Sequence, residues 1–259
     1  MILRRVIEHV RKQHWTAVFL DFVIVVVGVF IGIQVSNWNA AQMDARRGEE
    51  YAERLATDLK YDLEGRRSLV AYFDEVNKSL ENSIVLLADP NSDPRELVVN
   101  VYRSTEFAHN PQTRATWDEI VSAGELGLMP RDAVEGGISF YFGSDISEQT
   151  ASDVTSSPLR RRVRSILSHN VQKAIRAGCS DIRDGRNAVV SFVDECRIDA
   201  PDADIFAAAE ELRRDPELVR DLQLHASAMN TARANLRGEV IVLEAGIASL
   251  EDSGKKARK

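Results

Sequence analysis

Residues Trp15–Val35 read WTAVFLDFVIVVVGVFIGIQV, and this stretch decides how the rest of the chain is organised. From Phe22 to Ile33 every residue is apolar or glycine. As a helix that rises about 1.5 Å per residue, the stretch is about 31 Å long, close to the ~30 Å hydrocarbon thickness of a bilayer. Trp15 and Trp38 bracket it at the depth that indole rings prefer. The pattern predicts one transmembrane helix over 15–38.

Two alternatives to a permanent span are a buried core helix and a cleaved signal peptide. A core helix of a soluble protein rarely stays apolar on every face over this length. A signal peptide would account for the basic start, which contains Arg4, Arg5, Arg11 and Lys12. However, the apolar run is longer than a signal peptide needs, and no small-x-small cleavage pattern follows it. We therefore expect the helix to be retained as an anchor.

The charges on either side of the stretch predict its orientation. Residues 1–14 hold four Lys or Arg side chains and one acid, Glu8, whereas the segment after Trp38 mixes both signs. An excess of basic residues marks the cytoplasmic side of a span. We therefore expect a cytoplasmic basic segment over 1–14 and a helical extracytoplasmic domain over 39–251. A basic disordered tail is expected over 252–259, with contact to anionic headgroups as its alternative.

A stripe of small and polar residues runs along one face of the expected span. Gly28 and Gly32 form a GxxxG pattern, which lets two helix backbones approach closely, and Asp21 falls on the same face at helical periodicity. The alternatives are that glycine is simply frequent in membrane helices and that Asp21 is solvated near the interface. The stripe makes Asp21, Gly28 and Gly32 a candidate surface for self-association.

Two blocks of sequence carry a resemblance to known proteins. One is VGVFIGIQVSNWN (27–39), followed by a charged helix that begins near EEYAERLATDL (49–59); the other is TRATWDEIVSAGELGLM (113–129). Together they resemble a family of uncharacterised bacterial proteins with one N-terminal membrane helix. Here AGELGLM stands where a polar Ser-Gly-Asn turn would be expected. The resemblance implies a topology and no activity, and with the charge bias it predicts an inner-membrane protein whose domain lies in the periplasm.

The composition of the domain limits its partners. Beyond residue 39 the chain holds 29 basic and 38 acidic side chains, a net charge of −9. An acidic domain argues against nucleic acid as a partner. The partners that we expect are the lipid bilayer, a second copy of the chain and a protein not identified by the sequence.

The two cysteines, Cys179 and Cys196, are too few for a metal site without nearby histidines. In an oxidising compartment a disulfide between them is plausible, and two buried thiols are the alternative. We expect no cofactor.

The spacing of apolar residues predicts an all-α fold. Apolar residues recur at threes and fours over 44–87 and again over 216–250, which indicates two long amphipathic helices that pair antiparallel. Shorter helices are expected over 94–103, 116–124, 130–142, 159–177, 187–195 and 203–213, and the polar segment 143–158 is expected to be a flexible loop. The fold class is thus a transmembrane helix that continues into an elongated helical bundle.

Aromatic residues in the middle of the chain form a candidate pocket or core. Trp117, Phe140 and Tyr141 lie on two of the shorter expected helices. A core anchor is the simpler interpretation of Trp117, and a ligand platform is the alternative. Four arginines, Arg160, Arg161, Arg162 and Arg164, could bind an anion or a lipid, but pairing with the acids of the domain is the expectation that we favour.

No catalytic motif is present. The five histidines have no HExxH or other paired spacing, and there is no GxSxG, phosphate loop or dinucleotide fingerprint. We therefore expect a non-enzymatic, membrane-anchored interaction, scaffold or sensory module that self-associates. The alternative is a periplasmic ligand-binding receptor, which a buried polar pocket near Trp117 would favour. An enzyme would be favoured if three or more titratable groups met in one cleft.

Overall fold

The structure is a computed structural model that describes residues 15–193 and 195–257. It is 78% helical and 3% strand, which confirms the all-α class. The expected cytoplasmic segment 1–14 and residues 258–259 lie outside the described residues. The chain divides into two compact units, Met1–Glu50 and Tyr51–Lys259, and each is considered by itself.

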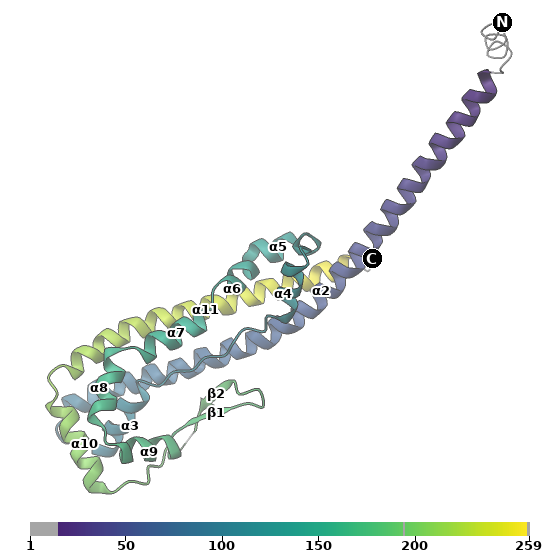
Figure 1. Cartoon of the computed structure of the whole chain (residues 1–259). Helices are drawn as coiled ribbons and strands as arrows, with labels where there is room; N and C mark the ends of the chain where they lie inside the picture. The colour runs from purple at the N-terminus through teal and green to yellow at the C-terminus, as the bar shows by residue number, and fades with distance from the viewer. Residues whose placement is uncertain (1–14, 194, 258–259) are drawn as a thin grey trace, which may run out of the picture. The chain divides into compact units, whose positions relative to one another are not determined.

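The first unit contains the apolar part of helix α2 (Trp15–Ala88), drawn in purple in Figure 1. Its large apolar side chains are exposed, with Phe19 at 66%, Phe22 at 64% and Phe30 at 60%. None of the apolar window is buried inside the chain, in contrast to the core helix of a soluble protein. The helix is long and apolar enough to cross a membrane, and within the described chain it is the one helix that is.

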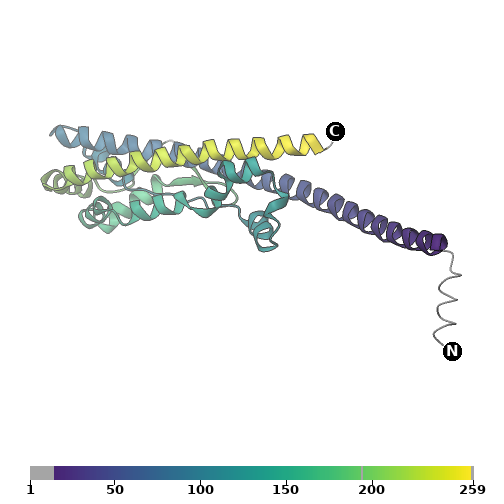
Figure 2. The same cartoon turned by 90° about the horizontal axis from the view of Figure 1, so that it is seen from above.

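The second unit is built on residues 51–88 of α2 and on helix α11 (Leu218–Ala257), which run side by side in Figures 1 and 2. Three buried clusters join them along their length. The clusters pair Leu55 and Leu59 with Leu243 and Ile247, Phe73 and Val76 with Met229 and Leu236, and Leu80 with Leu218 and Leu222. Because rising numbers on α2 meet falling numbers on α11, the two helices are antiparallel, as the apolar spacing predicted.

One group of short helices surrounds the turn end of this pair. It comprises α3 (Pro94–Arg103), α8 (Pro158–Ile166), α9 (His169–Gly178) and α10 (Asp202–Arg214), which together bury the cluster around Leu80. Asp93 caps α3 by accepting a hydrogen bond from the backbone N–H of Arg95 at 2.8 Å. The single helix expected over 159–177 is two helices, because Leu167 is extended and Ser168 caps α9.

A second group covers the side of α2 and α11. It comprises α4 (Ala115–Ser122), η1 (Leu126–Leu128), α5 (Arg131–Ala133), η2 (Val134–Ile138), α6 (Ser139–Gly143) and α7 (Ile146–Thr155). The helix expected over 130–142 is broken into three pieces, because Gly137 adopts φ +126° inside η2.

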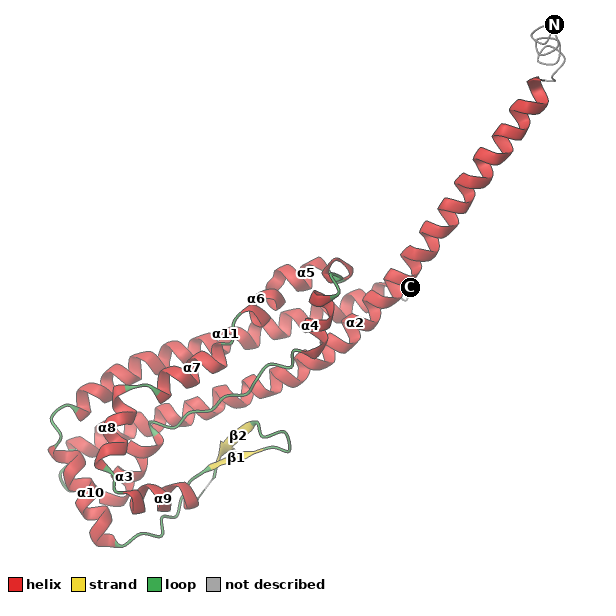
Figure 3. Cartoon of the chain, viewed as in Figure 1, coloured by secondary structure: helices red, strands yellow, loops and turns green. Residues whose placement is uncertain are grey.

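Three expectations from the sequence are wrong. The flexible loop expected over 143–158 contains α7, which Asp145 caps and which buries Thr150 and Val154. The helix expected over 187–195 is replaced by a hairpin of β1 (Asp181–Arg183) and β2 (Val189–Phe192), yellow in Figure 3. The expected tail 252–259 begins inside α11, which continues to Ala257.

Candidate functional site

Of the aromatic residues expected to form a pocket or a core, Trp117 and Tyr141 belong to a buried apolar cluster. Trp117 stacks on Phe142 with ring centroids 4.9 Å apart and planes at 15°, and both are buried. Tyr141 is also buried, at 1% exposure. Phe140 is not part of this core: it is 61% exposed, because successive residues of a helix point about 100° apart. The structure therefore brings Trp117 and Tyr141 together and leaves Phe140 on the surface.

Behind this core, Tyr141 leads into a buried polar centre on α2. Its hydroxyl donates to Asp62 Oδ2 at 2.8 Å. The same carboxylate accepts hydrogen bonds from Thr113 Oγ1 at 2.7 Å and from the Thr113 backbone N–H at about 3 Å. Burial raises the pKa of Tyr141 well above its ordinary value, so the tyrosine stays neutral and donates. Asp62 thus ties both α6 and the 110–113 segment to α2.

One turn further along α2, Arg66 forms a buried ion pair with Glu239 of α11. The two side chains are 1% exposed, and Arg66 Nε lies 2.7 Å from Glu239 Oε2. Burial raises the pKa of the Glu239 carboxyl, and the charge of Arg66 opposes that shift. Arg66 Nη1 donates to the Asn110 carbonyl at 2.6 Å. Arg66 Nη2 and Glu239 Oε1 have no hydrogen-bond partner among the described residues.

Asn110 connects this centre to the hairpin. Its Oδ1 accepts from the Val189 N–H at 2.9 Å, and its Nδ2 lies 3.2 Å from the Gly65 carbonyl of α2. A cavity of about 240 Å³ borders the centre, lined by Asp62, Arg66 and Asn110 among others. Apart from Arg66 Nη2, the polar atoms described above for Asp62, Arg66 and Asn110 are engaged with side chains or with backbone, so the arrangement joins α2, α6, α11 and β2.

Sequence reasoning missed Asp62, Arg66, Asn110 and Glu239. A signal for two of them was present, because Asp62 and Arg66 occur in the inward-facing series 55, 59, 62, 66, 69, 73, 76 and 80 of α2. A polar residue at a core position of an amphipathic helix indicates a buried partner. Nothing in the sequence indicates which residue that partner is.

The arginines of α8 pair with acids of the domain, as expected. Arg160 and Arg164 both contact Glu106, with Arg160 Nη1 at 3.6 Å. Arg162 donates to Asp221 at 2.6 Å and to Asp215 at 3.2 Å. Three of the four arginines are therefore used inside the domain.

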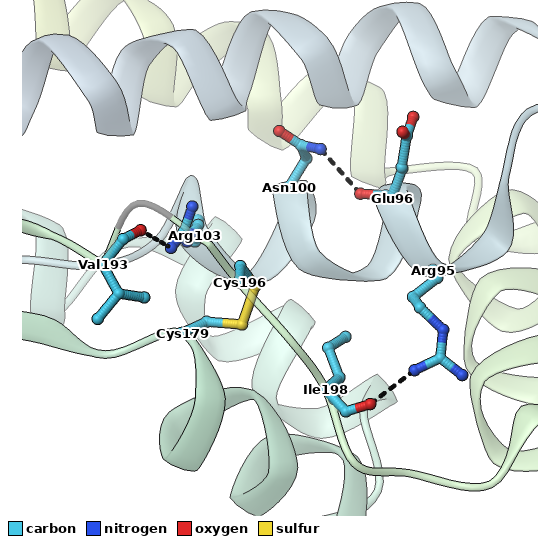
Figure 4. Close-up of a disulfide and its surroundings, with 8 residues drawn as sticks. All are labelled: Arg95, Glu96, Asn100, Arg103, Cys179, Val193, Cys196 and Ile198. Atoms are coloured by element: carbon cyan, nitrogen blue, oxygen red, sulfur yellow. Dashed lines mark hydrogen bonds between the residues drawn. A yellow bond between two sulfur atoms is a disulfide. The ribbon is translucent and has the colours of Figure 1, made fainter.

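The two cysteines are joined by a disulfide, shown in Figure 4. Cys179 ends α9 and is 4% exposed, and its Cα lies 4.6 Å from that of Cys196. The backbone passes closely at this point: a Cβ built on Gly178 would lie 1.8 Å from the Arg197 carbonyl oxygen. Glycine at 178 is what allows α9 and the segment after the hairpin to meet.

Side chains of α3 hold the same segment on either side of the disulfide. Arg103 Nη2 donates to the Val193 carbonyl at 3.3 Å, and Arg95 Nη1 donates to the Ile198 carbonyl at 2.8 Å (Figure 4). The disulfide and these two arginines therefore fix the connection between β2 and α10.

The candidate association stripe lies in the first unit, on α2. Asp21 is exposed, and a Cβ built on Gly28 or Gly32 would meet nothing within 4 Å in the described chain. Among the described residues, no group of three His, Cys, Asp or Glu side chains is placed to hold a metal ion.

Comparison with known proteins returned no match: no family model, curated protein or solved structure matches this chain.

Proposed function

We propose that this chain is a membrane-anchored, extracytoplasmic interaction module that self-associates and acts as a scaffold or sensor rather than as an enzyme. One observation carries the proposal: helix α2 contains both the apolar segment and residues of all three buried clusters of the domain. A change in the association of the anchors would then act on the helix against which the domain packs.

The position of the domain outside the cytoplasm is supported by the disulfide and by the basic N-terminal segment. Disulfides persist in oxidising compartments and are rare in the cytosol. The excess of Lys and Arg before the span favours a cytoplasmic N-terminus. Together these features favour a single-pass protein of the inner membrane with its domain in the periplasm.

Self-association is supported by the stripe of Asp21, Gly28 and Gly32. In a bilayer, helices associate through close packing at small residues and through hydrogen bonds between polar ones. A carboxyl inside a span is costly unless it finds a partner or reaches the interface. A second copy of the same helix offers both a glycine face and a second Asp21.

Crosslinking of the full chain in native membranes tests the self-association. An amine-reactive reagent can use Lys60 and Lys78, whose side chains are 56% and 67% exposed. We expect a crosslinked dimer that Gly28→Leu and Asp21→Asn each reduce several-fold. Phe30→Leu is the matched control, because it lies on the opposite face of the helix from Gly28. Undiminished crosslinking in both variants would refute the assignment of this stripe.

The two rival functions have different support. An enzyme is favoured by the convergence of Tyr61, Asp62 and Arg66 at one cavity. However, the Asp62 carboxylate accepts three hydrogen bonds, so it does not present a free base. A receptor with its pocket at Trp117 is not favoured, because Trp117 belongs to a cluster of buried apolar residues. A ligand site elsewhere in the domain is a separate question.

A further inference from the structure

A groove lies between helix α11 and the segment that joins α7 to α8. Helices α7 and α8 both contact α11 (Figure 1). Its volume is about 300 Å³, at the lower end of the range for small-molecule sites. All of its lining residues belong to the Tyr51–Lys259 unit. The groove therefore does not depend on the anchor or on the function proposed above.

The floor of the groove is apolar and its rim is open. Val154, Leu159 and Met229 form the floor and are at most 3% exposed. At the rim, Leu224 is 63% exposed and Ala228 is also exposed. The α11 residues of the lining repeat at threes and fours, so one stripe of that helix faces the groove. A small apolar ring would cover this floor.

Two buried polar side chains belong to the lining of the groove. Thr150 is 4% exposed. His225 is 5% exposed, and its Nε2 has no hydrogen-bond partner in the described chain. Burial lowers the pKa of His225, while a hydrogen bond to the Ser104 backbone opposes that shift. Burial thus favours the neutral ring, in which one nitrogen donates and the other accepts, so Nε2 is an acceptor when Nδ1 carries the proton.

The charges around the groove exclude an anionic ligand. No lining residue is a Lys or Arg, whereas Asp153 and Asp221 both belong to the lining. Asp221 is already paired with Arg162 at 2.6 Å, so it offers no free counter-charge to an amine. Asp153 is exposed, where water and salt screen its charge. A neutral ligand fits this lining best.

We propose that this groove is a binding site for a small, neutral, mostly apolar molecule that carries one hydroxyl group, of the size of a simple phenol. A hydroxyl both donates and accepts, so it can donate to His225 Nε2 and accept from the Thr150 hydroxyl. The ring of such a molecule covers Val154, Leu159 and Met229.

The methionines of the chain provide a site-specific test in the full-length protein. With ¹³C-labelled methyl groups and the protein in lipid nanodiscs, Met229 reports on the groove, Met129 on the separate Trp117 core, and exposed Met43 on non-specific contact of a probe outside the groove. The probes are 4-methylphenol, toluene and 4-methylbenzoate, which share one ring size and differ in the polar group.

We expect 4-methylphenol to shift the Met229 resonance saturably and to bind at least tenfold more tightly than toluene, with no binding of 4-methylbenzoate. Thr150→Val and His225→Leu should each weaken 4-methylphenol several-fold and leave toluene unchanged. Ala228→Trp should fill the groove and abolish the shift, whereas Ala234→Trp, on an exposed face of α11 outside the groove, should not.

Three results would overturn the proposal. These are no saturable shift of Met229 with 4-methylphenol, equal affinity for toluene or 4-methylbenzoate, and a response of Met129 that matches that of Met229. None of them bears on dimer crosslinking through Gly28, so this site and the self-association proposed above can fail independently.

Discussion

At the scale of single residues, the domain is organised around charges that it buries. Asp62 and Arg66 interrupt an otherwise apolar series on α2, and each reaches a different part of the fold. A buried ion pair is rarely worth more than apolar side chains of similar volume, but an unpaired buried charge is costly. The pair of Arg66 and Glu239 therefore adds little to the stability of the domain. Its main effect is to specify which positions of α2 and α11 lie opposite each other.

Arg66→Met should destabilise the domain by about 3–5 kcal/mol, because Glu239 is then left buried without its partner. The measurement is urea-induced unfolding of the full chain, followed by circular dichroism. The double variant Arg66→Met with Glu239→Leu is the control, and it should recover most of the lost stability. A double variant as unstable as the single one would show that the pair itself, rather than the unpaired charge, supplies the stability.

His225 predicts how stability depends on pH. Because burial lowers its pKa in the folded state, the unfolded chain binds a proton at His225 that the folded chain does not. The stability that neutral His225 allows is present above its unfolded pKa of about 6.5 and is lost as pH falls below that value, by up to about 1.4 kcal/mol per pH unit.

Unfolding measured between pH 7.5 and 5.5 checks this slope. The wild type should lose stability relative to His225→Gln as pH falls, because glutamine does not titrate. If the difference between the two proteins stays constant over this range, His225 does not exclude protons from the folded domain.

At the scale of elements, one glycine sets the break between α5 and α6. Gly137 has φ +126°, and a Cβ built on it would lie 2.7 Å from Val242 Cγ1 of α11. A Cβ built on the neighbouring Gly136 would meet nothing within 4 Å in the described chain. The break places Tyr141 over Asp62 and Phe142 on Trp117.

Gly137→Ala should therefore cost about 1–3 kcal/mol, from the unfavourable φ and the contact with Val242 together. Gly136→Ala should be neutral or stabilising, because it removes a flexible residue from a helical segment without a clash. Thermal unfolding of the two variants side by side compares these effects. Equal melting temperatures would mean that Val242 of α11 can move away from the added methyl group at residue 137 at little cost.

The long elements could be predicted from the sequence, and several short ones could not. The series over 44–87 and 216–250 is long enough for its helical period to be unambiguous. Residues 187–195 are too few for that, and Asp184-Gly185 with Val189-Val190 is also the pattern of a turn and a strand. Segment 143–158 was expected to be a loop because of its polarity, yet Asp145 caps a helix there whose buried face uses Thr150 and Ala151.

The candidate sites were predicted only in part, because a local sequence pattern shows which residues share one element but not which elements meet. The stripe of Asp21, Gly28 and Gly32 could be proposed because it depends on positions along one helix. The polar centre and the groove depend on residues more than 50 positions apart, such as Thr150 and His225, and no local pattern specifies which of them meet. Phe140 was misplaced because the break at Gly137 sets which residues of α6 face inward.

At the scale of the whole molecule, the chain consists of two units that are considered separately. The domain is a helical unit whose long pair is joined by three apolar clusters and a buried ion pair, and a disulfide joins the end of α9 to the segment between β2 and α10. The anchor is an apolar helix with an exposed glycine face. The proposed function requires the domain to lie outside the cytoplasm, where the Cys179–Cys196 bond forms and a periplasmic partner is accessible.

The most direct test of that claim is a topology measurement on the full chain, with alkaline phosphatase or green fluorescent protein fused to the C-terminus. Phosphatase folds to its active form only outside the cytoplasm, because it needs disulfides. We predict phosphatase activity without fluorescence in bacterial cells. Fluorescence without phosphatase activity would place the domain in the cytoplasm and contradict the proposed function.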